Sequence, residues 1–312
     1  MRVCYHIQTH RLPAQIVRLV RVLRAMDPDG PILISHDAGG CPPPLDELAA
    51  VPGVHVSVDA GGYGDASHLD RYLKALRWLA DHDVDFDWLE NITGQCYPLR
   101  PLGDMHRMLD GSGFDGFLGC LPVFTSEVLT TARDARDRYL FHHHRLGRPS
   151  PAKQRWLRPL MAVNYVQPLV RVSTTFSTVG VRRARTPFGP AFRCYGGWFF
   201  GTLDRACVEY VHDFARDNPD FMAYLRGTLA PEEIFLQTAL VNDGRFRLNT
   251  DSLRYIDMTG SRHGHSKTLG AADVAPAVAS GAHWARKFDI ERDPAALDLL
   301  DGRLLRGREV IP

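Results

Sequence analysis

The first hundred residues alternate between short apolar runs and amphipathic stretches. Residues 3–7, 32–34 and 54–58 are apolar runs of strand length bounded by turn residues. Residues 13–23 and 67–79 carry apolar side chains at helical spacing, and Pro13 stands where a first helical turn tolerates proline. Strands alternating with helices predict an α/β fold with a Rossmann-like, mostly parallel sheet and helices on both faces.

Polar and glycine-rich turns follow two of these predicted strands. Asp37 ends the second strand, and Gly61, Gly62, Tyr63 and Gly64 follow the third. Sheets of this type bind ligands beyond the carboxyl ends of their strands. Position alone therefore favours a nucleotide-type pocket, and the alternative is that the glycines only turn the chain.

The later chain divides into two parts. Residues 125–190 are rich in arginine and proline without a clean period, so we expect an irregular, partly helical insertion that acts as a lid or an acceptor-side loop. The histidine run 142–144 is expected to be exposed rather than metal-binding, since neighbouring side chains on a regular element diverge. Residues 194–200 predict a strand, and residues 204–216 and 231–240 predict helices. One domain, 1–312, then comprises a nucleotide-binding half (1–124), the insertion, and an acceptor and catalytic half (191–312).

Composition excludes several protein classes. The chain of 312 residues has 37 Lys and Arg against 36 Asp and Glu, which argues against a general nucleic-acid binder. No apolar run is long enough to span a bilayer, and the opening residues are typical of a strand rather than a signal peptide, so we expect a cytoplasmic protein. Six cysteines without close spacing indicate reduced thiols rather than a zinc site or disulfides.

An acidic pair, Glu232 and Glu233, opens the predicted helix after Pro231. One interpretation is a simple charge effect, because the helix dipole favours acids in the first turn. The other is a general base that accepts a hydroxyl proton. The dipole is expected to lower the pKa of these carboxyl groups and keep them ionised.

Cationic candidates stand late in the chain: Arg262, Lys267, Arg286 and Lys287. The pair at 286–287 lies between Trp284 and Phe288, so it is either a solvated face or a partly buried site that stabilises a leaving phosphate. A metal ion held by an Asp-x-Asp pair is the other common device, but Asp85 and Asp87 come before the strand at 88–92, at its wrong end. The pattern favours a site without metal.

Short segments spread over most of the chain carry a family resemblance. They are residues 3–10 (VCYHIQTH), 34–37 (ISHD), 87–99 (DWLENITGQCYPL), 196–199 (GGWF), 231–233 (PEE) and 285–289 (ARKFD). In this order they resemble the motifs of the core-2/I-branching β-1,6-N-acetylglucosaminyltransferase family, in a soluble form of bacterial type. The resemblance implies a GT-A-type fold, an inverting mechanism and a UDP-sugar donor, most often UDP-N-acetylglucosamine, used without a metal cofactor.

The resemblance also implies roles for individual residues. Glu233 matches the general base. Lys287 matches a diphosphate contact that Arg286 assists, and a further contact falls on either Arg262 or Lys267. The nucleotide site matches His10, Asp37, Tyr63 and Gly64.

The chain departs from the family pattern at two positions. Cys96 stands where the signature has aspartate, and Glu232 stands where aspartate is usual. We assign both to the side of a small-molecule or glycan acceptor. Trp198 and Trp284 are further candidates for that side, since aromatic faces stack on sugars.

The predicted activity is transfer of a sugar, N-acetylglucosamine before others, from a UDP-sugar to an acceptor hydroxyl. One alternative is a metal-dependent transferase of the same fold that uses Asp85 and Asp87. The other is a catalytically silent module that binds a sugar nucleotide or a glycan.

Overall fold

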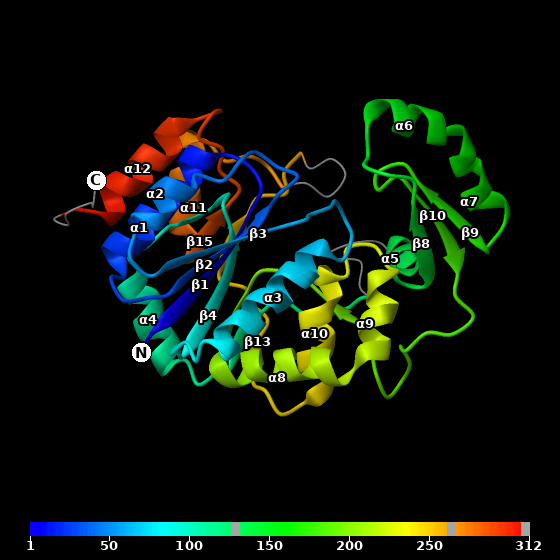
Figure 1. The fold of residues 1–312 in the computed structure, drawn as a ribbon, viewed down its shortest axis with the longest axis horizontal. Coiled ribbons are helices and arrows are strands. Elements are labelled where there is room, and N and C mark those ends of the chain that lie inside the picture. The colour runs from blue at the N-terminus through cyan, green and yellow to red at the C-terminus, as the bar shows by residue number, and fades with distance from the viewer. Residues whose placement is uncertain (126–131, 261–265, 307–312) are drawn as a thin grey trace.

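A seven-stranded sheet forms the centre of the molecule in a computed structural model that describes residues 1–125, 132–260 and 266–306 (Figure 1). Its strands, in spatial order, are β13 (Leu248–Asn249), β6 (Gly116–Leu118), β12 (Gly201–Asp204), β4 (Trp88–Thr93), β1 (Val3–Thr9), β2 (Ile32–Asp37) and β3 (Val54–Asp59). Strand β12 runs antiparallel to β4 and β6, while the other pairs are parallel. The predicted α/β fold with a mostly parallel sheet is confirmed.

Alternate side chains of the sheet enter two separate apolar cores. Tyr5 and Ile7 of β1 pack on one face, and Cys4 packs on the other. The first face is covered by α1 (Pro13–Met26), α2 (Leu45–Ala49), α4 (Leu102–Gly111), α11 (Ala271–Ala279) and α12 (Pro294–Leu304). The second is covered by α3 (Ser67–Asp81), α8 (Arg205–Asp217), α9 (Pro219–Arg226) and α10 (Glu232–Asp243). Both faces are therefore buried, as continuous apolar strands require.

A small second sheet joins the end of the chain to the region after β4. It contains β14 (Arg254–Ile256), β15 (Trp284–Arg286) and β5 (Cys96–Pro98), in that order. The backbone N–H of Phe288 donates to the Gln95 carbonyl at 2.9 Å, and Gln15 Nε2 donates to the Gly94 carbonyl at 2.8 Å. These bonds fix the cationic residues 286–287 beside the carboxyl end of β4.

The insertion is more regular than its sequence predicts. It forms an antiparallel sheet, β8 (Phe141–Arg145), β10 (Thr178–Arg182) and β9 (Val170–Ser173), with α5 (Ala132–Tyr139), α6 (Pro151–Leu157), η1 (Pro159–Ala162) and α7 (Val163–Val166) around it. Figure 1 shows it beside the main sheet, in green. His143 is buried whereas His142 and His144 are exposed, because side chains alternate along β8. No group of three His, Cys, Asp or Glu in the described ranges could hold a metal ion.

The strand predicted at residues 194–200 is wrong over its second half. Only β11 (Tyr195–Gly196) forms there, paired with β7 (Leu121–Pro122), and the chain enters the main sheet later, at Gly201. The apolar pair Phe199 and Phe200, which suggested a strand, is instead buried in the wall of a cavity. Within the described ranges, no helix has both the length and the apolar character needed to cross a membrane.

Candidate active site

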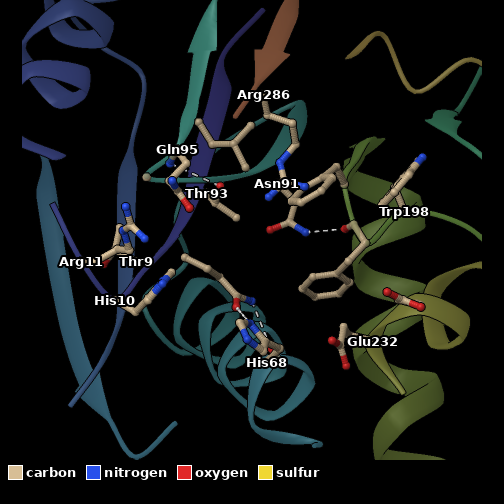
Figure 2. A pocket seen from close by; sticks show the side chains of 16 residues that line it. Thr9, His10, Arg11, His68, Asn91, Thr93, Gln95, Trp198, Glu232 and Arg286 are labelled. Carbon is tan, nitrogen blue, oxygen red and sulfur yellow. Dashed lines mark hydrogen bonds between the residues drawn. The ribbon is translucent and has the colours of Figure 1, made fainter. Parts of the chain in front are cut away.

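Two cavities meet at His10, beyond the carboxyl ends of the parallel strands. The first, with a volume of about 240 Å³, is lined by residues 8–11 at the end of β1, 91–95 around the end of β4, 198–200, the start of α10, His68 and Arg286. Figure 2 shows Trp198 and Glu232 on one side of it and Thr9, His10 and Arg11 on the other. This is the position in which α/β sheets bind ligands.

The acidic pair forms one wall of the first cavity. Glu233 Oε2 lies 2.9 Å from Arg138 Nη1, and the same guanidinium lies 3.0 Å from Asp134. Burial raises the pKa of Glu233, while the charge of Arg138 opposes this rise. A carboxylate with a raised pKa is a stronger proton acceptor than an ordinary glutamate, and the ion pair with Arg138 favours its ionised form.

Glu232 lies beside this carboxylate but forms no ion pair with a described cation. Its Oε2 atom is buried and has no hydrogen-bond partner among the described residues. Burial, followed by the charge of Glu233, raises the pKa of Glu232 to about 8. The expectation that the helix dipole lowers the pKa of both acids is therefore wrong, because desolvation outweighs the dipole here.

Replacing Glu232 with glutamine is expected to make the protein less sensitive to pH. The unfolded chain binds no proton at this site above about pH 4.5, whereas the folded protein keeps its proton up to about pH 8. The free energy of unfolding of the wild type therefore falls as pH rises from about 4.5 to about 8. The variant has no titrating group at this position and loses less stability over the same range. Thermal midpoints measured from pH 5 to pH 9 should diverge in favour of Glu232→Gln as pH rises. Parallel curves would show that Glu232 is not protonated in the fold.

Cations form another wall of the same cavity. Arg11 and Arg286 line it, and the Arg286 guanidinium lies 4.2 Å from the centre of the Phe200 ring. Arg11 forms an ion pair with the buried Asp289. Burial and then the charges of Arg286, Arg11 and Arg292 lower the pKa of Lys287, a predicted diphosphate contact that follows Arg286 in the chain but lines neither of the two cavities. The accumulated positive charge favours an anionic ligand.

A buried ion pair, which sequence reasoning missed, supports this wall from beneath. Arg254 of β14 pairs with Glu90 of β4, and both side chains are fully buried. Thr202 Oγ1 of β12 donates to Glu90 at 2.7 Å. Burial and the charge of Arg286 lower the pKa of Arg254 to about 9. The pair joins the two sheets directly below the cavity.

The floor of the first cavity is neutral and hydrogen-bonded. Asn91 Oδ1 lies 2.9 Å from His6 Nδ1, and Asn91 Nδ2 donates to the Phe199 carbonyl at 2.7 Å. His68 Nδ1 lies 2.8 Å from Gln8 Oε1. Burial lowers the pKa of His6 and of His68 to about 4, so both are neutral near pH 7. The net charge around the cavity therefore comes from its two walls.

The second cavity, of about 510 Å³, contains His10, Asp37 and Tyr63, three of the residues predicted for the nucleotide site. Asp37 Oδ1 accepts the backbone N–H of Gly39 at 2.7 Å. A Cβ atom at Gly61 would collide with the Asp37 carboxylate, so a larger residue there would displace this side chain from its present position. Gly64 has φ +63° and packs against Phe176. The glycines thus turn the chain and shape the cavity at once.

The insertion supplies the opposite wall of the second cavity through Arg148, Pro149, Gln154, Thr174 and Thr175. Arg145 also donates to the Tyr63 carbonyl at 2.9 Å, and the Tyr63 ring stacks on Phe176 with centroids 5.6 Å apart. Sequence reasoning missed these residues and Arg138. The only signal was the arginine content of the insertion, which does not specify individual positions.

Several predicted residues lie outside the two cavities. Lys267 Nζ lies 2.6 Å from Asp273 and 3.7 Å from Asp257, where these carboxylates neutralise it. Cys96 is fully buried, with Sγ 3.4 Å from the Thr93 hydroxyl. Trp284 is a fully buried core residue. Arg262 lies outside the described residues.

The aspartates of the metal-dependent alternative lie at the far end of β4. Asp85 is 3.4 Å from Arg2, and Asp87 accepts the backbone N–H of Arg2 at 2.6 Å. Both precede Trp88, whereas the first cavity begins at Asn91 on the same strand. They cannot contact a ligand in either cavity.

Comparison with known proteins gives distant structural likenesses. No family model and no curated protein matches the chain. Among solved structures, Staphylococcus aureus TarS in complex with UDP is 12% identical over 100% of this chain and 67% of its own, with a TM-score of 0.41. The same protein in complex with UDP-GlcNAc is 14% identical over 40% of this chain and 39% of its own, with a TM-score of 0.30. A nucleoside-diphosphate-sugar pyrophosphorylase from Vibrio cholerae RC9 is 9% identical over 80% of this chain and 90% of its own, with a TM-score of 0.35. This chain spans less than half the length of the first two TarS structures it matches, 21% and 39%.

Proposed function

We propose that the protein is a glycosyltransferase of GT-A type that moves a sugar from a UDP-sugar to an acceptor hydroxyl. The observation that carries the proposal is the pair of adjoining cavities, in which an acidic wall faces a cationic one and the joining residue is His10. A sugar nucleotide has the matching parts: an aromatic base, a diphosphate and a sugar. An inverting transferase needs one base and a cationic site for the leaving diphosphate.

The nucleoside binds in the second cavity. Tyr63 offers an aromatic face there, and Asp37 offers hydrogen-bond acceptors. The diphosphate then passes His10 and reaches Arg11 and Arg286, with Lys287 behind them. The sugar occupies the first cavity, and the acceptor enters beside Trp198 and Glu232.

The chemical step uses residues of the first cavity and Lys287, which follows Arg286 in the chain. The Glu233 carboxylate takes the proton of the acceptor hydroxyl as its oxygen forms a bond to the anomeric carbon of the sugar. The bond from that carbon to the diphosphate oxygen breaks on the opposite face, and its electron pair leaves with UDP. Arg286 and Lys287 stabilise the negative charge that develops on the leaving oxygen. Attack and departure on opposite faces invert the anomeric centre.

The donor we propose is UDP-N-acetylglucosamine, used without a metal ion and in the cytoplasm. The choice of UDP-N-acetylglucosamine rests on the family resemblance of residues 87–99, 231–233 and 285–289. Catalysis without a metal ion is supported by the cations at 11, 286 and 287, which supply positive charge where a metal ion acts in other transferases.

The test is calorimetry with UDP, followed by a panel of UDP-sugars with acceptor glycans and detection of released UDP, with and without EDTA. We expect UDP to bind and one UDP-sugar to be turned over equally well in EDTA. Activity that EDTA abolishes and Mn²⁺ restores would support a metal-dependent enzyme instead. UDP binding without any transfer or hydrolysis would support a silent binding module.

A further inference from the structure

The insertion has a charge balance unlike that of the whole chain. Residues 125–190 contain twelve Lys and Arg against three Asp and Glu, all three before residue 138, in a protein whose net charge is +1. Some of these cations are neutralised, since Arg138 pairs with Glu233 and Arg171 with Asp137. Arg155, Arg158 and Arg182 are exposed and form no ion pair with a described carboxylate. The free cations thus leave a strongly positive surface on the insertion.

Apolar side chains project from the same part of the chain. The three most exposed large apolar residues of the described chain are Val166 at 81%, Tyr165 at 75% and Trp156 at 71%. Leu160 and Leu169 are also exposed. We call these five residues the distal surface. Figure 1 shows α6 and α7, which carry most of it, along the outer edge of the insertion and away from the seven-stranded sheet.

We propose that the distal surface binds an anionic lipid membrane as a peripheral contact, a role that does not depend on the proposed transferase activity. Exposed apolar side chains enter the boundary between headgroups and acyl chains, and tryptophan and tyrosine favour this depth. Arg155 on α6 and Arg158, the residue that caps the end of α6, stand on either side of Trp156 in the sequence and attract acidic headgroups. The combination of free cations and projecting aliphatic side chains fits such a surface.

Two other occupants fit less well. A second copy of the chain would place one acid-free positive face against another, and like charges at a symmetric interface repel. A nucleic acid would satisfy the arginines and stack on the aromatic rings, but it offers nothing to Val166, Leu160 or Leu169. The membrane alone uses both the charge and the aliphatic side chains.

Co-sedimentation with vesicles tests the proposal. We expect binding to vesicles of phosphatidylcholine with about 30% phosphatidylglycerol, weak binding to phosphatidylcholine alone, and loss of affinity at high salt. The double variant Trp156→Ser with Val166→Ser should bind at least tenfold more weakly, as should Arg155→Ala with Arg158→Ala.

A matched control replaces exposed leucines elsewhere, Leu45→Ser with Leu299→Ser, which are 49% and 54% exposed. It should bind like the wild type, and all variants should keep the wild-type thermal midpoint because the altered side chains are exposed. Equal binding by the Trp156 and Val166 variant would overturn the proposal. A concentration-dependent dimer that this variant abolishes, without vesicle binding, would assign the surface to a second copy. Binding to a single-stranded oligonucleotide that only the arginine variant weakens, again without vesicle binding, would assign it to nucleic acid.

Discussion

Replacing Glu233 with glutamine is expected to lower the rate of sugar transfer at least about a hundredfold while leaving UDP affinity within about twofold. The amide has nearly the shape of the carboxylate but cannot take the proton of the acceptor hydroxyl. UDP binding is spared because the nucleotide contacts lie in the second cavity and on the cationic wall, whereas Glu233 lies on the acidic wall. Single-turnover transfer rates and calorimetry with UDP measure the two quantities separately.

The matched control is Glu209→Gln, an exposed glutamate on α8 whose one ion pair within the described part of the chain is with Arg205. It should transfer sugar at the wild-type rate. The thermal midpoint of Glu233→Gln should change little, since Arg138 keeps Asp134 as a partner. Near-full turnover by Glu233→Gln would mean that another group is the base, and Glu232→Gln would then be the next variant to assay.

The parts of the fold with a strong sequence period could be predicted. Strands β1 to β4 and helices α1, α3, α8 and α10 lie within a few residues of their predicted positions, because each buries a continuous run or a full helical face. The insertion could not be predicted in this way. Its strands are short, polar and paired only with one another, so they carry no apolar run that marks them as strands.

The candidate site was predictable where its chemistry is local in sequence. The acid pair follows Pro231 directly, and the cations stand together at 286–287, so composition and order sufficed to find them. The partners of these groups come from distant segments. Arg138 reaches Glu233 from the insertion, and Arg254 reaches Glu90 from another sheet. Such pairs depend on tertiary packing, as do the pKa shifts that desolvation imposes on Glu232 and Glu233.

The two cavities and the insertion form one connected unit. Phe176 of the insertion stacks on Tyr63 of the nucleotide turn, and the Arg138 guanidinium lies 5.8 Å from the centre of the Phe176 ring. Arg138 in turn holds Glu233. A ligand that contacts Tyr63 in the second cavity therefore touches the first member of a series of contacting side chains. The series continues through Phe176 and Arg138 to Glu233, the proposed base.

Replacing Arg254 with methionine is expected to lower the free energy of unfolding by about 3–5 kcal/mol, because it leaves the Glu90 carboxylate buried without its cation. Both side chains are fully buried, so water cannot solvate the Glu90 carboxylate once its cationic partner is removed. Equilibrium denaturation in urea measures the change. The matched control, Arg107→Met, removes an exposed ion pair with Asp104 and should cost less than about 1 kcal/mol.

The double variant Glu90→Leu with Arg254→Met separates the penalty of a lone buried charge from the value of the pair. Two apolar side chains of similar volume remove that charge, so we expect the double variant to recover most of the stability lost in Arg254→Met. Its transfer rate should stay below that of the wild type, because the double variant also loses the hydrogen bonds from Arg254 to the Asn91 and Gly201 carbonyls, which hold β14 and its neighbour β15, the strand of Arg286, beside the main sheet. If Arg254→Met costs no more than Arg107→Met, the pair does not anchor the two sheets. The hydrogen bonds of residues 286–288 to β5, Gln95 and Leu269 would then hold the cationic wall.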